Sequence, residues 1–285
     1  MASHFKLDKL NSKFLIKIIT LIPLTIILCI LSGYVYGNYL NKIKFETDVV
    51  SASEENANKL FTVSKVVLFS SANAEQHEVS KKAIWDLDIS QYTDIAIYID
   101  NQKENGVSAR NTISSLTIDE TSFVTAPELG TPSLYYKNIH QFGTFEKKEE
   151  NRIENSSYSF NIINYNENID YSKPSVYNDL GNPITLSYIN SNIKEHAIIS
   201  DTSNPLTFDG NLLKRANIPL SSIKTTLHLK LHLTTNMNEQ YVCSMNIEIP
   251  LEDKENVEGS TSIYDGYLTK EIQDSNFYHF YKISS

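Results

Sequence analysis

The chain contains very little cysteine, glycine and proline for its length. Only two of its 285 residues are cysteines, Cys29 and Cys243, and Cys29 lies inside a long apolar segment. The rest of the chain therefore has one thiol and cannot form an internal disulfide, which excludes disulfide-stapled folds and CxxC zinc or redox motifs. Nine glycines and eight prolines are too few for a collagen-like or low-complexity chain.

Basic residues are scarce after the first 37 positions. Residues 1–37 hold four lysines and one aspartate, which leaves 21 basic and 33 acidic residues in 38–285, a net charge of −12. Because this part has no basic stripe, we expect it to bind neither nucleic acid nor an anionic membrane surface. The acidic excess is typical of a soluble exterior.

Linear catalytic motifs are missing as well. The chain has no G-x-S-x-G elbow, no HExxH, no phosphate-binding G-x-x-x-x-G-K-[ST] and no dinucleotide-binding G-x-G-x-x-G. Carboxylate pairs have no linear signature, so these absences do not exclude catalysis. The sequence predicts no catalytic, cofactor-binding or metal-ligating residue, and it favours a domain that is not an enzyme.

A long apolar run stands near the N-terminus. Ile18–Tyr36 is 19 residues without a charge, about 28 Å as a helix, which matches a hydrocarbon core of about 30 Å. We therefore predict a transmembrane helix over residues 14–37 that contacts the lipid bilayer through Ile18–Tyr36. Four lysines precede the run and only Lys42 and Lys44 follow it closely, so residues 1–13 are expected in the cytoplasm and the body outside the cell membrane.

A cleaved signal peptide is the alternative interpretation of this run. The run is longer than the usual apolar region of a signal peptide, roughly 7–15 residues, and no pair of small residues marks a cleavage site. We therefore expect a retained, single-pass anchor rather than a secreted β-domain.

The hydrophobic period changes along the exported part. Residues 38–60 have partly helical spacing and are interpreted as a juxtamembrane stalk. From about residue 61 the period is two, as in strands with one buried face. Strands are expected at 83–90 and 93–100, joined at Ser90–Tyr92, at 184–189 and 197–200, and as a hairpin over 223–250. The pair Asp265-Gly266 is typical of a type I′ turn.

These patterns predict an all-β exported domain. With roughly nine to eleven strands and no long amphipathic helix after residue 61, an antiparallel β-sandwich over 61–285 is favoured over an alternating α/β fold. The highly charged stretch 146–155 is expected to be a solvated loop, or a boundary between two smaller sandwiches.

Several residue groups suggest chemistry but have simpler explanations. His228 and His232 are about 13 Å apart on a strand, too far to share one zinc ion. Cys243 alternates with apolar residues and is expected to be a buried, inert thiol. The oxygen-rich segment 201–209 is a minor calcium candidate that turn formation explains. Asp86 and Asp88 share one strand face and are expected to be solvated.

The function expected from the sequence is that of a membrane-anchored extracytoplasmic binding or assembly module. Its partner would be a protein or an envelope polymer, reached through exposed aromatic residues or an open sheet edge. An envelope-associated enzyme of hydrolase type is the alternative, which a deep polar cleft would favour.

Overall fold

The computed structural model describes most of the chain after residue 60. The described residues are 32–33, 36, 60–77, 84–101, 107–154, 157–200, 205–253, 261–273 and 278–283. Nearly all of the predicted stalk and of the predicted transmembrane helix lies outside them, and Leu60 is the one stalk residue that is described. Within this described part, no helix has both the length and the apolar character needed to cross a membrane. Residues 58–285 form one compact unit.

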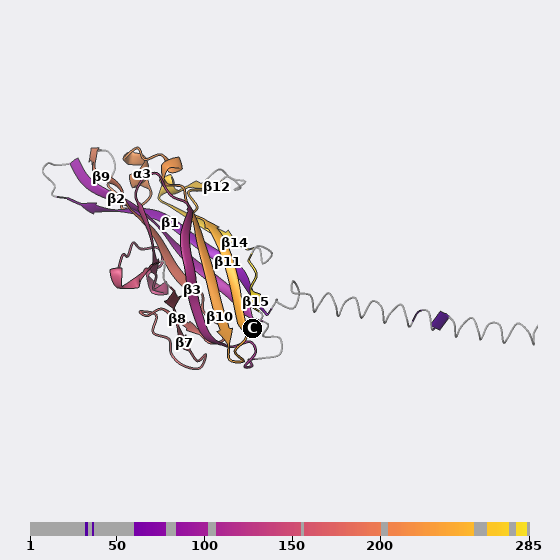
Figure 1. The fold of residues 1–285 in the computed structure, drawn as a ribbon. Coiled ribbons are helices and arrows are strands. Elements are labelled where there is room, and N and C mark those ends of the chain that lie inside the picture. The colour runs from indigo at the N-terminus through magenta and orange to yellow at the C-terminus, as the bar shows by residue number, and fades with distance from the viewer. Residues whose placement is uncertain are drawn as a thin grey trace, which may run out of the picture. The chain divides into compact units, whose positions relative to one another are not determined.

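One large sheet contains the longest strands of the protein (Figure 1). Its neighbouring strands are antiparallel. The order across this six-stranded sheet is β14 (Tyr267–Ile272), β1 (Phe61–Gln76), β2 (Ile84–Asn101), β9 (Ile184–Ser200), β4 (Thr131–Tyr136) and β5 (Arg152–Ile153).

A second sheet of five antiparallel strands packs against the first. The hairpin predicted over 223–250 is confirmed and lies near its centre. The order is β15 (Tyr281–Ile283), β11 (Gln240–Glu248), β10 (Thr226–Thr235), β3 (Ile113–Thr125) and β6 (Tyr158–Ser159). Two small pairs complete the strands of the described residues: β12 (Glu252–Asp253) with β13 (Thr261–Ser262), and β7 (Asn161–Ile163) with β8 (Ser175–Tyr177).

The main core lies between the two sheets, so the predicted all-β, sandwich-like class is confirmed. Strand β10 shows why one face of a strand enters this core. Its leucines at alternate positions are fully buried, while His228 and His232 between them are partly exposed. Across the core lie apolar residues of β1 and β2, such as Val66, Ile95 and Ile97. On the second sheet, alternation thus separates a buried face from a solvent-facing one. In the large sheet, β2 is buried on both faces over Gln91–Ile97.

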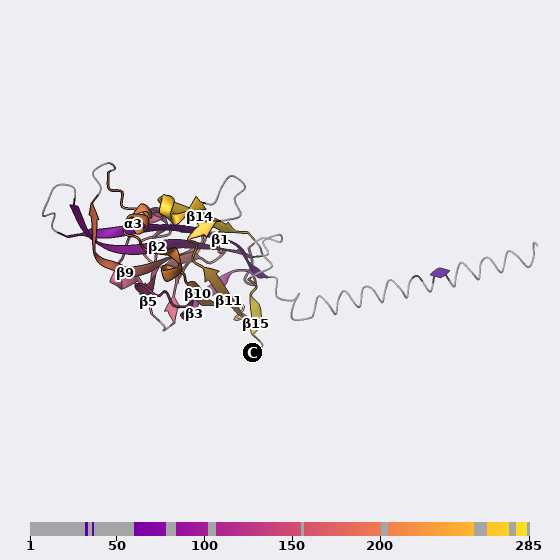
Figure 2. The same cartoon turned by 90° about the horizontal axis from the view of Figure 1, so that it is seen from above.

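A second apolar cluster covers one end of the long strands. It joins parts of β1, β2 and β9 to the short helix α3 (Asn211–Arg215), to the 3₁₀ turn η4 (Leu220–Ile223) and to the 3₁₀ turn η5 (Ile263–Asp265). Figures 1 and 2 show α3 beside this end of the strands. The sequence segments 205–223, 249–253 and 261–268 therefore close the sandwich where the second sheet does not reach.

Three local predictions were wrong. Residues 84–101 form one strand rather than two, because Gln91 pairs with Ala72 on one side and with Asn190 on the other. The two strands expected within 184–200 are likewise one, β9. Asp265-Gly266 ends a 3₁₀ turn capped by Ser262 instead of forming a type I′ hairpin, and only Gly266 of the two has a positive φ, 120°.

Candidate functional site

A groove opens between the two sheets on the side of β3, β4 and β5. Its volume is about 630 Å³, and its walls are Thr121–Phe123 of β3, Pro132–Leu134 of β4, and Arg152–Glu154 at β5. Leu134 and Ile153 are buried at its base, and Phe123 packs edge-on against Tyr188 with ring centroids 5.7 Å apart. Hydroxyls, apolar carbons and one charge of each sign therefore share the surface.

Strand edges without a partner border this groove. Strand β3 is paired with β10 along its length, but on its other side it meets β6 only at Thr117 and Ile118. Strand β4 is paired with β9 over Thr131–Tyr136, but with β5 only at Leu134 and Tyr135. Within the described ranges, residues 119–124 and 131–133 thus each have one edge with no strand beside it. Such edges offer backbone donors and acceptors to another chain.

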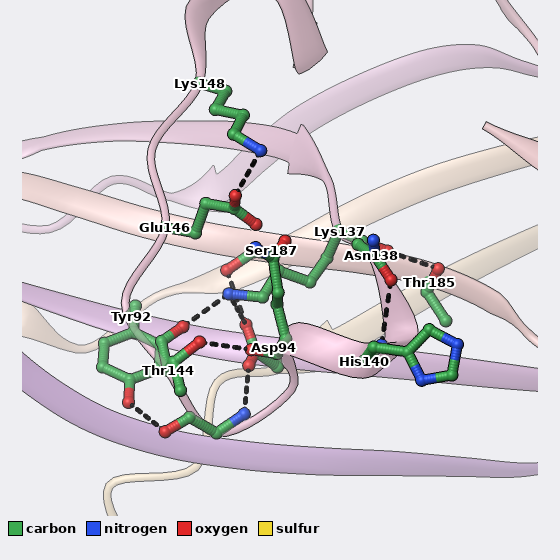
Figure 3. Close-up of polar contacts among 12 residues, drawn as sticks. Tyr92, Asp94, Lys137, Asn138, His140, Thr144, Glu146, Lys148, Thr185 and Ser187 are labelled. Atoms are coloured by element: carbon green, nitrogen blue, oxygen red, sulfur yellow. Dashed lines mark hydrogen bonds and ion pairs between the residues drawn. The ribbon is translucent and has the colours of Figure 1, made fainter. Parts of the chain in front are cut away.

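A buried ion pair stabilises the loop next to β4 (Figure 3). Lys137 Nζ lies 3.6 Å from Asp94 Oδ1 and donates a hydrogen bond to the Thr144 carbonyl. Asp94 also accepts hydrogen bonds from the Ser187 hydroxyl (2.8 Å) and the Gly143 backbone N–H (2.8 Å). Burial raises the pKa of Asp94 and lowers that of Lys137, and the opposite charge of each partner works against both shifts.

This network has the features of a structural element. Both side chains are at most 1% exposed, so neither is open to solvent. The Tyr92 hydroxyl donates to the Gly143 carbonyl, and the Thr185 hydroxyl donates to the Lys137 carbonyl. Together these bonds hold residues 137–144 on the outer face of the sheet. They also fix the C-terminal end of β4. Residues Pro132–Leu134 of the same strand form one wall of the groove.

A histidine and aspartate group lies at the far end of β1, β2 and β9. His77 directly follows β1, Asp86 and Asp88 lie on β2, and His196 lies on β9. His77 Nε2 is 2.8 Å from Asp88 Oδ2, and His196 Nδ1 is 3.2 Å from Asp86 Oδ1. The two imidazole rings stack with centroids 4.6 Å apart. We call these four residues the His77 cluster.

Hydrogen bonds and charges within the His77 cluster shift the pKa values of two residues, Asp88 and His77. A hydrogen bond from the His196 backbone N–H, followed by the contact with His77, lowers the pKa of Asp88. The Asp88 carboxylate raises the pKa of His77. Asp88 is therefore ionised at neutral pH. The sequence interpretation placed Asp86 and Asp88 on a solvated face, whereas the structure brings both into contact with histidines.

The histidines that the sequence singled out have separate partners. His228 Nδ1 is 2.8 Å from Asn246 Oδ1, and His232 Nδ1 is 3.3 Å from Asp119 Oδ2. Both lie on strand β10, as predicted. Cys243 is fully buried on β11, and burial raises its pKa to about 12.

The calcium candidate is only partly described, because residues 201–204 lie outside the described ranges. In the described remainder, Asp209 accepts hydrogen bonds from the Asn211 backbone N–H and the Thr207 hydroxyl. These contacts shape a turn before α3.

Sequence reasoning missed His77 and His196 because no local spacing connects them. They are 119 positions apart, and only the pairing of β1 with β2 and of β2 with β9 brings them together. The one available signal was the Asp86-x-Asp88 repeat on a wet strand face.

Comparison with known proteins adds no relative: no family model, no curated protein and no solved structure matches this chain.

Proposed function

We propose that this protein is a membrane-tethered extracytoplasmic binding module that captures an extended segment of a partner protein. The observation that carries the proposal is the groove bordered by 119–124 of β3 and 131–133 of β4, where no described strand pairs with the outer edge. An extended segment adding to a strand edge gains backbone hydrogen bonds, and side chains at alternate positions fill the groove.

The lining of the groove suggests the chemistry of this segment. Phe123, Leu134 and Ile153 offer apolar contact, while Arg152 and Glu154 offer one charge of each sign. A segment with an apolar side chain at every second position and little net charge fits this surface best. The strongly acidic body disfavours acidic partners and gives no reason for a nucleic acid to bind.

The tether is supported by the apolar run Ile18–Tyr36 and the four lysines before it. Protease added to intact cells or spheroplasts is expected to digest the body, and full protection would contradict the proposed orientation. Mass spectrometry of the mature protein is expected to find peptides from residues 1–17. A mature N-terminus near Asn38 would instead indicate a secreted domain.

Photo-crosslinking in cells tests the groove. A photoreactive residue placed at Ser122 on β3 and, separately, at Ser133 on β4 is expected to crosslink to the same short segment of the same partner. Ser244, an exposed serine on β11, is the matched control site. Crosslinks at Ser244 to that segment, or different segments at the two groove positions, would contradict capture in the groove.

A further inference from the structure

The backbone around the His77 cluster is shaped to bring His196 to the two aspartates. Strand pairing places Leu87 opposite Ala197 and Ile89 opposite Lys194. Between these pairs β2 has one residue, Asp88, and β9 has two, so β9 forms a bulge there. His196 within this bulge has φ = 48°, in the left-handed region that non-glycine residues seldom adopt. Bulges of this kind re-aim a side chain next to functional sites.

Hydrogen bonds to the same bulge orient the potential ligands. The His196 backbone N–H donates to Asp88 Oδ1 at 2.9 Å, which leaves Asp88 Oδ2 directed at His77 Nε2. On the other side, the Asp86 carboxylate lies 3.2 and 3.3 Å from His196 Nδ1. A carboxylate on one imidazole nitrogen is the usual arrangement behind a metal-binding histidine, because it sets the tautomer and leaves the other nitrogen for the metal.

The ligand atoms are close enough to meet at one ion. One ligand atom each from His77, Asp88 and His196 lies within 4.8 Å of the others. Zinc bonds of about 2.0–2.2 Å in a tetrahedron require ligand atoms about 3.3–3.6 Å apart. Small side-chain rotations cover that difference, because both histidines are partly exposed, at 37% and 69%.

From this geometry we propose that the His77 cluster binds a divalent transition-metal ion of the Zn²⁺ type. His77, Asp88 and His196 are the ligands, and Asp86 positions His196. The partly exposed side leaves a fourth coordination position for water or for a group of a partner. Two imidazoles and a carboxylate suit zinc, whereas calcium and magnesium prefer sets made only of oxygen. The site departs from the expectation, drawn from the sequence, that the chain has no metal ligands.

Calorimetric titration of the full chain tests this site. The protein is stripped with a chelator, freed of any affinity tag and titrated with ZnCl₂. Saturable binding of one Zn²⁺ per chain is expected, together with a rise in melting temperature, because an ion that binds only the native state stabilises it. Calcium chloride is expected to produce neither effect.

Four variants assign the ligands. Asp88→Asn keeps an oxygen for the His196 backbone N–H but loses the second carboxylate oxygen, and it is expected to weaken Zn²⁺ binding at least tenfold. His77→Gln is expected to do the same, and so is His196→Asn, since Asn tolerates the left-handed backbone. Asp86→Asn removes only the positioning carboxylate, and a loss of about tenfold is expected.

The control variant carries His228→Gln and His232→Gln, which remove two histidines elsewhere on the sandwich. It is expected to bind Zn²⁺ as the unchanged protein does. Absence of saturable binding by the unchanged chain would overturn the proposal. The proposal would also be overturned if His77→Gln and His196→Asn bound Zn²⁺ as tightly as the unchanged chain. Loss of binding in the control variant alone would overturn it as well. Far-ultraviolet circular dichroism of each variant separates loss of the site from loss of the fold.

Discussion

Lys137 Nζ lies 3.6 Å from Asp94 Oδ1 in a part of the protein where neither side chain is exposed by more than 1%. Asp94 is on β2 and Lys137 directly follows β4, and strand β9 separates these two strands in the sheet. The ion pair therefore ties together three neighbouring strands and the loop that covers them. Removing water from two charges is costly, so such a pair is stable only while both partners remain.

Replacing one partner of this pair is expected to destabilise the protein strongly. Lys137→Met leaves the Asp94 carboxylate buried without an opposite charge, and the free energy of unfolding should fall by about 3–5 kcal/mol. The double replacement Lys137→Met with Asp94→Asn leaves no buried charge and is expected to cost less than the Lys137→Met replacement alone. Urea unfolding of Lys137→Met, Asp94→Asn and the double variant measures the coupling free energy between the two side chains. Additive losses would mean that the two groups do not interact.

The C-terminal segment is expected to contribute to stability through one side chain. Phe280 is fully buried and packs edge-on against Phe61, with ring centroids 6.3 Å apart. Phe280→Ala should lower the free energy of unfolding by about 3–5 kcal/mol, because it leaves a cavity in the core. Tyr281→Ala, at a position that is 53% exposed, should change it by about 0.5 kcal/mol or less. Thermal unfolding of both variants checks the prediction, and equal effects would contradict it.

Removing one buried hydroxyl is expected to stabilise the protein. Tyr188 is fully buried, and its hydroxyl has no hydrogen-bond partner within the described residues. Tyr188→Phe should raise the free energy of unfolding by about 1 kcal/mol, since a buried polar atom without a partner is a penalty. Tyr136→Phe is the matched control: its hydroxyl donates to the Tyr171 carbonyl at 2.8 Å, so this change should lower stability by about 1 kcal/mol. Denaturant titration is expected to separate the two variants by sign.

The buried thiol is expected to react only after unfolding. Burial raises the pKa of Cys243 to about 12, and a raised thiol pKa means less of the reactive thiolate. At pH 8 the thiolate fraction is roughly one in ten thousand. Alkylation by iodoacetamide, followed at the Cys243 peptide by mass spectrometry, should be negligible in the native protein and rapid in urea. Rapid alkylation of the native protein at pH 8 would show that the strand opens readily.

The fold class could be predicted because alternation is a local property. In β10 the leucines at every second position specify which face is buried, whatever the strand pairs with. Strand lengths could not be predicted in the same way. Ser90–Tyr92 lacks an apolar alternation and was interpreted as a link, but hydrogen bonding of Gln91 to strands on both sides keeps it extended.

Features that depend on near neighbours could be predicted from the residues alone: a cysteine-poor acidic body, an all-β fold, a central hairpin and an apolar run suited to a membrane. Features that depend on pairing between distant segments became visible only in the folded chain. Among the described residues, the groove needs β3 and β4 to leave part of one edge unpaired, and the His77 cluster needs a bulge that turns His196 toward Asp88. Strand register decides both, because it is set by contacts among all the strands of a sheet and not by the residues of one segment.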